Sequence, residues 1–216
     1  MTVTTEAEVT DALRDAILRG DYVAGQRLVE ADLCERFGAT RFVIRTALQA
    51  LAGQGLVEVR RHQGARVRVV SIEEAIEITE VRRALEGLCA ARAAEHATAK
   101  DRSELRRIIR EMKAAAKGGE PLLYSEKNGE LHSAIRRISG HDTSSRIIEQ
   151  LRGQIVRHQF HLALQPGRPQ VSLPQHEAIV AAIIARDPAA AEAAMRQHID
   201  SVLTSLRELP ANRVRR

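Results

Sequence analysis

Aromatic side chains are scarce in this 216-residue chain. They make up 2% of the residues, with no Trp, two Tyr and three Phe. This scarcity argues against an aromatic-rich β-sandwich and favours packed helices with a core of Ala, Leu, Ile and Val. It also argues against single-stranded nucleic acid as the target, because that mode of binding relies on base stacking.

Cysteines and long apolar runs are also few. The two cysteines, Cys34 and Cys89, lie far apart and form no C-x-x-C pattern, so we expect small buried residues in a reducing compartment. The longest apolar run, Ala178–Ala185, is too short to span a bilayer, and no apolar leader opens the chain. We therefore expect a soluble, cytoplasmic protein without a membrane partner.

Charge is unevenly distributed over the first seventy residues. Residues 1–35 carry three Arg against eight acidic residues, whereas residues 36–70 carry seven Arg against one acidic residue, Glu58. The reversal predicts a local basic surface of the kind that binds phosphate. A solvated charged face is the alternative, but the arginines fall where a DNA-binding motif would use them.

Helical periodicity predicts three short helices in residues 1–54. Gly20 and Gly38 end the first two helices, and Thr40 caps a third that runs to about Gln54. Their buried faces are formed by Val9, Leu13 and Ile17, then Leu33 and Phe37, then Ile44, Leu48 and Leu51. This order is typical of a helix-turn-helix.

The third helix carries the candidate DNA-reading residues. Arg41 and Arg45 are four residues apart and project from one face near its start, beside Thr40 and Phe42. Arginine suits this role because its planar fork can bond guanine O6 and N7 together. In the alternative, both arginines only pair with phosphates or with Glu30 and Asp32.

After Gly55 the sequence changes to a pattern with a period of two residues, which is typical of β-strands. Residues 56–59 and 65–69 are predicted to be two strands joined by Arg60, Arg61, His62, Gln63 and Gly64. A basic hairpin beside a helix-turn-helix is a wing, whose tip would contact phosphate or the minor groove. Gly64 would allow the tight turn.

The stretch from Leu13 to Val69 resembles the DNA-binding domain of the GntR family. It keeps, in order, AIL-x-G, G-x-R-L-x-E-x-x-L, G-x-(S/T)-R-x-x-x-R-x-A-L, and GLV followed by a basic wing. The stretch differs from the family pattern at two places, and both differences affect which operator sequence we expect it to read. Phe42-Val43 replaces a pair of a small residue and Pro, and Ala31 stands where some members have an Arg that contacts DNA.

The rest of the chain is predicted to be an antiparallel all-α bundle. A capping box, Ser71 with Glu74, starts it directly after the wing, so we place the domains at residues 1–70 and 71–216. Ser172 with Gln175 forms a second predicted capping box. The expected helices are 73–96, 99–117, 121–138, 142–164, 173–186 and 188–207. A loop, Gln165-Pro166-Gly167-Arg168-Pro169, is expected after the fourth of them.

Four polar residues of this bundle form a candidate metal site. Asn128 and His132 share one face of a helix, and His176 and His198 lie on later helices. Three imidazoles and one oxygen donor suit zinc, nickel or manganese. The chain has eight histidines, so the spacing of these four residues does not by itself identify a metal site. The alternative is a structural cluster of histidines.

Residues 80–198 resemble the FCD ligand-binding domain of the FadR subfamily. The matching stretches are Glu80–Glu86, Asn128-x-x-x-His132, Gln175-His176-x-x-Ile179, Arg186-Asp187 and Ala194-Met195-x-x-His198. The resemblance implies Asp, His, His and His ligands to a metal that helps to bind a small carboxylate effector. Asn128 replaces the Asp here, which removes a negative charge and weakens coordination.

Arg82 is a candidate ligand for the effector carboxylate. A salt bridge with Glu86, four residues on, is its alternative role. As a whole the sequence predicts a homodimeric transcription regulator that binds an inverted-repeat operator and responds to an organic acid. Of the two modes of regulation, repression is favoured over activation. One alternative is a metal-dependent enzyme, and the lack of an evident general-base motif argues against it. The other alternative is a metal-buffering or scaffold protein.

Overall fold

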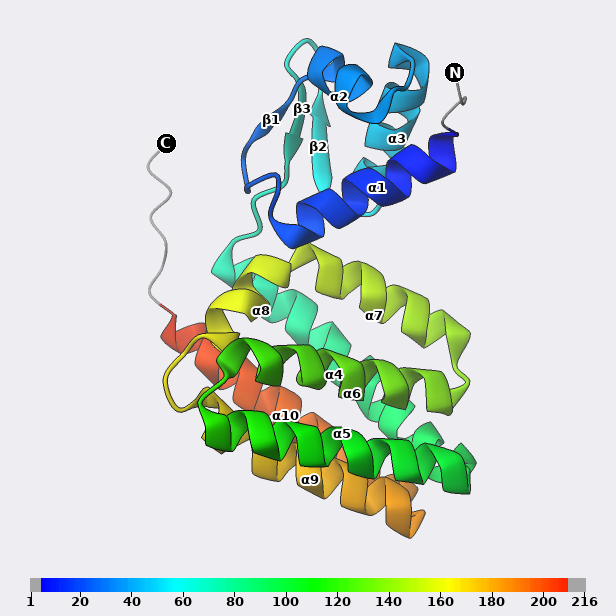
Figure 1. The fold of residues 1–216 in the computed structure, drawn as a ribbon, viewed down its shortest axis with the longest axis vertical. Helices are drawn as coiled ribbons and strands as arrows, with labels where there is room; N and C mark the ends of the chain where they lie inside the picture. Colours follow the sequence, from blue (N-terminus) through cyan, green and yellow to red (C-terminus); the bar gives the residue numbers. More distant parts are fainter. Residues whose placement is uncertain (1–4, 210–216) are drawn as a thin grey trace. The chain divides into compact units, whose positions relative to one another are not determined.

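The computed structural model describes residues 5–209 and divides into two compact units (Figure 1). One unit contains the chain up to Val70 with residues 152–156, and the other contains Ser71–Leu151 and the chain from Arg157 onward. The described chain is mainly α, with ten helices and one small sheet, which confirms the predicted fold class. No helix within residues 5–209 has both the length and the apolar character needed to cross a membrane.

The first unit begins with the three predicted helices, α1 (Glu6–Arg19), α2 (Glu30–Phe37) and α3 (Arg41–Gly53). Thr5 and Glu8 form a capping box on α1, and the Thr40 hydroxyl caps α3 by accepting from the Val43 amide at 3.4 Å. Left-handed glycines follow α1 and α2, at the predicted ends. The helix-turn-helix is therefore confirmed.

A three-stranded antiparallel sheet completes this unit, with strand order β1-β3-β2. The strands β2 (Val57–Arg60) and β3 (Gly64–Val67) form the predicted wing hairpin. The sequence analysis missed β1 (Arg27–Leu28), which pairs with β3 through Leu28 and Ala65. Two residues are too few to show strand alternation, and the pairing depends on a distant partner.

The first unit has its own apolar core. α3 packs on α1, α2 and β2, as the periodicity of its apolar residues requires. Among the most fully buried residues are Val9, Leu13, Leu33, Ile44, Ala47 and Leu51. This core holds α3 so that its opposite, polar face stays in solvent.

The second unit is a helical bundle, as predicted. It contains α4 (Ile72–His96), α5 (Ala99–Gly118), α6 (Pro121–Ser139), α9 (Arg168–Ala185) and α10 (Pro188–Glu208), together with most of α7 (Asp142–Gln154) and α8 (Val156–Ala163). α4 packs against α6, α9 and α10, and α5 packs against α6 and α9. Residues Leu105, Ile108, Met112, Leu131, Ile135 and Ile179 are among its fully buried side chains.

The predicted helix 142–164 is wrong as a single element, because the chain turns at Ile155 between α7 and α8. The Ile155 amide bonds the Arg152 carbonyl at 3.2 Å, a tighter pattern than that of an α-helix. Gly153 and the β-branched pair Ile155-Val156 surround the turn, and all three have low helix propensity.

The predicted start of the next helix at residue 173 is also wrong. α9 begins at Arg168, so the predicted loop through Pro169 is already helical, and Pro174 lies inside the helix. Pro169 sits in the first turn, where no amide hydrogen is required. Ser172 is therefore not a cap, and its hydroxyl donates to the Arg168 carbonyl at 3.0 Å.

Candidate nucleic-acid interface and metal centre

The exposed face of α3 presents the residues predicted to read DNA. Thr40, Arg41, Phe42 and Arg45 are all exposed at its N-terminal end. Phe42 has 77% of its surface accessible, which is unusual for a large apolar side chain in solvent. The helix thus offers two cations and one aromatic ring on a surface supported from behind by the core.

The two arginines of this face differ in their surroundings. Arg45 donates from Nε to both carboxylate oxygens of Glu30, at 2.9 and 3.0 Å, so the predicted alternative partner is present. The Arg45 side chain remains 66% exposed. Arg41 makes no side-chain ion pair or hydrogen bond with any described residue. Of the two, Arg41 is the cation already available to an anionic partner.

The wing tip is a tight turn. The Gln63 amide bonds the Arg60 carbonyl at 3.1 Å, and His62 and Gly64 have φ angles of 62° and 80°. A left-handed conformation at Gly64 fits the role predicted for it. Arg60 pairs with Glu58 at 2.9 Å, whereas Arg61 and His62 are exposed at the tip.

Three predicted metal ligands converge inside the bundle. His132 of α6, His176 of α9 and His198 of α10 are 4%, 1% and 3% exposed. Their ring centroids are 4.2 to 5.6 Å apart, and one ligand atom from each lies within 4.8 Å of the others. One ion would lie about 2.0–2.1 Å from each nitrogen, so this convergence is what a shared site needs.

Each histidine uses its Nδ1 atom for a contact outside the cluster. His132 Nδ1 is 2.6 Å from Glu86 Oε2, and His198 Nδ1 is 3.0 Å from Gln175 Oε1. His176 Nδ1 is 3.2 Å from the Tyr124 hydroxyl. Metal-binding histidines are commonly oriented by such a bond on the ring nitrogen that does not bind the ion.

Two buried polar atoms of the four predicted ligands have no hydrogen-bond partner among the described residues. They are His176 Nε2 and Asn128 Oδ1, both of which can act as ligands. A buried acceptor without a partner costs free energy, about 1–3 kcal/mol. The donor set of three imidazoles and an amide oxygen fits a borderline divalent ion.

The protonation of the cluster also suits coordination. Burial lowers the pKa of His176 well below its usual value, and the neighbouring His198 and His132 lower it further. Burial is likewise the main cause of the lowered pKa of His198, followed by His132 and Arg168. Both imidazoles are thus held in the neutral form, which is the form that binds metal.

Arg82 forms the salt bridge that was its alternative role. Its Nε and Nη2 atoms donate to Glu86 Oε1 at 2.9 and 2.5 Å, and both residues are buried. The second oxygen of Glu86 bonds His132, so one carboxylate links the arginine to the cluster. Contact between Arg82 and an effector stays a prediction, in which the guanidinium would be shared with Glu86.

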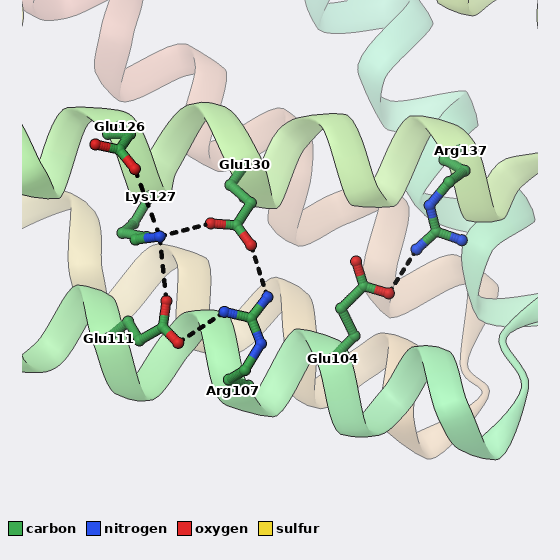
Figure 2. A network of polar contacts seen from close by, with 7 residues as sticks. All are labelled: Glu104, Arg107, Glu111, Glu126, Lys127, Glu130 and Arg137. Atoms are coloured by element: carbon green, nitrogen blue, oxygen red, sulfur yellow. Dashed lines mark hydrogen bonds and ion pairs between the residues drawn. The ribbon is translucent and has the colours of Figure 1, made fainter.

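A surface network of charges holds α6 against α5 (Figure 2). Arg107 of α5 contacts Glu111 and Glu130 at 2.7 and 2.6 Å, and Lys127 of α6 contacts Glu130 at 2.9 Å. Further along, Arg137 reaches Glu104 at 2.7 Å. Each exposed pair contributes only about 0–1 kcal/mol, and together they connect α5 to the helix that carries Asn128 and His132.

The sequence analysis missed the outer residues of the cluster. Glu86 was considered only as a partner of Arg82, and Tyr124 and Gln175 were given no role at the site. The contact of Tyr124 with His176 joins residues 52 positions apart, and that of Glu86 with His132 joins residues 46 apart. Such pairings depend on helix packing and have no local sequence signal.

Two family models match the chain. The model described as "Bacterial regulatory proteins, gntR family" matches residues 5–67, and the FCD domain model matches residues 77–201, more than half of the chain. The two matches correspond to the winged helix-turn-helix and to the bundle that contains the histidines.

Characterised relatives match over nearly their full length. The transcriptional repressor RspR of Escherichia coli (strain K12) is 27% identical, over 97% of this chain and 95% of that protein. The Uxu operon transcriptional regulator of the same organism is 30% identical, over 93% and 86%. Both are transcriptional regulators, so the enzyme alternative gains no support.

Solved structures share the fold. McbR/YncC of E. coli superposes with a TM-score of 0.79 at 23% identity, covering 96% of this chain and 99% of that one. A GntR transcriptional regulator from Rhodococcus sp. RHA1 gives a TM-score of 0.69 at 22% identity, covering 95% and 98%. On the family matches, this chain belongs to the GntR family of bacterial regulatory proteins and carries an FCD domain.

Proposed function

We propose that this regulator is a homodimeric repressor whose affinity for an inverted-repeat operator changes when a small organic acid binds a divalent metal in the FCD domain. Repression is the activity in the names of two relatives, RspR and the galactonate operon repressor of E. coli (strain K12). Because the proposed partner is chromosomal DNA, we place its action in the cytoplasm.

The DNA-binding half of the proposal rests on the exposed end of α3 and on the wing. Arg41 and Arg45 would enter the major groove, with Thr40 and Phe42 beside them. Arg60, Arg61, His62 and the backbone at Gly64 would contact phosphate or the minor groove. Arg45 would leave Glu30 to contact DNA. Breaking this ion pair costs little free energy because the pair is exposed.

The sensing half rests on the buried acceptors without partners. Asn128, His132, His176 and His198 would hold zinc, nickel or manganese, with the histidines binding through Nε2. The metal would supply a Lewis-acidic charge for an oxygen ligand. The observation that carries this proposal is the convergence of three buried histidines. Asn128 lies one helical turn before His132 on α6, and its buried Oδ1 atom has no hydrogen-bond partner among the described residues.

The charges around the site define the class of effector. The four ligand side chains are neutral, and the charge of Glu86 is balanced by its contact with Arg82. A divalent ion would therefore keep a net positive charge in a buried position, which is costly without a counter-charge. An effector with a carboxylate supplies that charge, and a neutral sugar does not.

Selection of duplex DNA from a random library by the full-length protein tests the first half. We expect an inverted repeat, and we expect Arg41→Ala/Arg45→Ala to abolish its retention with the fold intact. Arg106→Ala/Arg110→Ala is the matched control, because both residues are exposed on α5 at the same spacing. Equal losses in the two variants would contradict a DNA-reading role for α3.

The metal content of chelator-free protein tests the second half. We expect near-stoichiometric metal in the wild type and little in His132→Ala/His176→Ala. The control is His158→Ala/His161→Ala, which changes two histidines of α8 outside the cluster. No uptake by the wild type after dialysis against zinc, nickel and manganese would overturn the metal site and leave the DNA assignment standing.

A further inference from the structure

Two chains of hydrogen bonds run outward from the histidine cluster and meet at one residue, Arg168, at the start of α9. One chain leads from His176 through Tyr124 and Ser172 to the Arg168 carbonyl. The other leads from His198 through Gln175 and Ser201 to the Arg168 guanidinium. At the end of each chain is a group of Arg168 that can only accept or only donate a hydrogen bond. This group determines which atom is the donor in every other bond of the chain.

In the first chain the carbonyl of Arg168 can only accept. Ser172 therefore donates to it, at 3.0 Å, and its own oxygen accepts from the Tyr124 hydroxyl at 2.7 Å. The Tyr124 hydroxyl has a single proton, and Ser172 is the neighbour that accepts it. With its proton committed to Ser172, the Tyr124 oxygen must accept from His176 Nδ1 at 3.2 Å.

In the second chain the guanidinium of Arg168 can only donate. Its Nη1 atom donates to the Ser201 hydroxyl at 3.0 Å and to Ser205 at 3.3 Å. Ser201 then donates to Gln175 Oε1 at 3.1 Å, which orients the amide with its oxygen toward α10. The same oxygen must accept from His198 Nδ1 at 3.0 Å.

We infer that Arg168 is a positioning residue whose carbonyl and guanidinium hold His176 and His198 as Nδ1–H tautomers, so that both Nε2 lone pairs face the proposed metal position. The inference rests on the proposed metal site for its purpose, but the tautomers themselves exist without metal. Ser172, Tyr124, Gln175 and Ser201 transmit the constraint. A histidine already in the ligating tautomer needs no proton shift when metal binds.

The two branches can be broken separately. Arg168→Met removes the guanidinium but keeps the backbone carbonyl, so only the His198 branch loses its anchor. Ser201 can then turn and the Gln175 amide can flip, which offers His198 a donor in place of an acceptor. Ser172→Ala removes the acceptor of the Tyr124 proton, so Tyr124 can donate to His176, and only that branch changes.

Long-range 15N–1H correlation spectra of metal-free, histidine-labelled full-length protein report the tautomers directly. His176→Gln and His198→Gln assign the two signals. We expect Nδ1–H for both in the wild type, a mixed signal for His198 alone in Arg168→Met, and a mixed signal for His176 alone in Ser172→Ala. Arg168→Lys should restore His198, because an ammonium group also donates to Ser201.

Zinc affinity, measured by competition with a chromophoric chelator, gives the second readout. We expect Arg168→Met and Ser172→Ala each to bind zinc about 10- to 100-fold more weakly than the wild type, as is usual when an outer partner of a metal ligand is removed. Nε2–H in the wild type for either histidine, or identical changes at both histidines in both variants, would overturn the inference. Correct tautomers with no zinc uptake would overturn only the proposed metal site.

Discussion

Glu86 Oε2 lies 2.6 Å from His132 Nδ1, and the two residues are 2% and 4% exposed. Because a carboxylate accepts, this contact holds His132 with its proton on Nδ1. The other oxygen of the same carboxylate binds Arg82. One buried group therefore joins a cation of α4 to a candidate ligand of α6.

Replacing Glu86 by Gln should destabilise the bundle and weaken metal binding. The buried Arg82 loses its counter-charge, which typically costs about 3–5 kcal/mol, and metal affinity should fall about 10- to 100-fold. Urea unfolding of metal-free protein and zinc titration measure the two effects. Glu111→Gln is the control, since Arg107 and Glu111 have the same order and spacing but are exposed, so its effect should stay within about 1 kcal/mol.

Replacing Asn128 by Asp should tighten metal binding. The substitution adds the negative charge that the amide lacks, next to a buried divalent ion. We expect an increase in zinc affinity on the order of 10-fold, equal to about 1.4 kcal/mol, and a loss in Asn128→Ala. If Asn128→Asp and Asn128→Ala bind zinc like the wild type, residue 128 is not a ligand.

Operator affinity should fall steeply with salt, because phosphate contacts release counterions. Removal of one wing contact by Arg61→Ala should reduce the slope of log affinity against log salt by about 0.9. The loss should be the same for operator and unrelated duplexes, since phosphate contacts carry no sequence information. Fluorescence anisotropy at several salt concentrations measures the slope, and an unchanged slope in the variant would remove Arg61 from the interface.

Acid should destabilise the bundle through the α5–α6 network (Figure 2). Hydrogen bonds from Arg107, followed by Lys127, lower the pKa of Glu130 below its ordinary value of 4.5. A depressed carboxyl pKa stabilises the folded state above pH 4.5, and this contribution disappears as the pH falls through the folded-state pKa.

The test of this network is Arg107→Gln in metal-free protein. We expect the acid-unfolding midpoint to move to higher pH, while stability at pH 7 changes by no more than about 1 kcal/mol because the pairs are exposed. Circular dichroism against pH measures the midpoint. Arg106→Gln, one residue away and without an ion pair in the described chain, should leave it unchanged.

Much of the fold was predictable because it is encoded by neighbouring residues. The apolar spacing of Val9, Leu13 and Ile17 and the cap at Thr40 predicted α1 and the start of α3. Errors arose where local signals competed. Pro169 indicated a loop, but a proline in the first turn of a helix needs no amide hydrogen, so α9 starts at Arg168.

The sequence by itself determined which residues could act at the site. It placed Asn128 and His132 on one face of a helix, and it supplied His176, His198 and the arginines of the third helix. Only the tertiary structure decided that α6, α9 and α10 bring the three histidines together, with Glu86, Tyr124 and Gln175 behind them. The physical reason is range: helix periodicity and capping act over about four residues, whereas the pairing of side chains from separate helices depends on how the whole bundle packs.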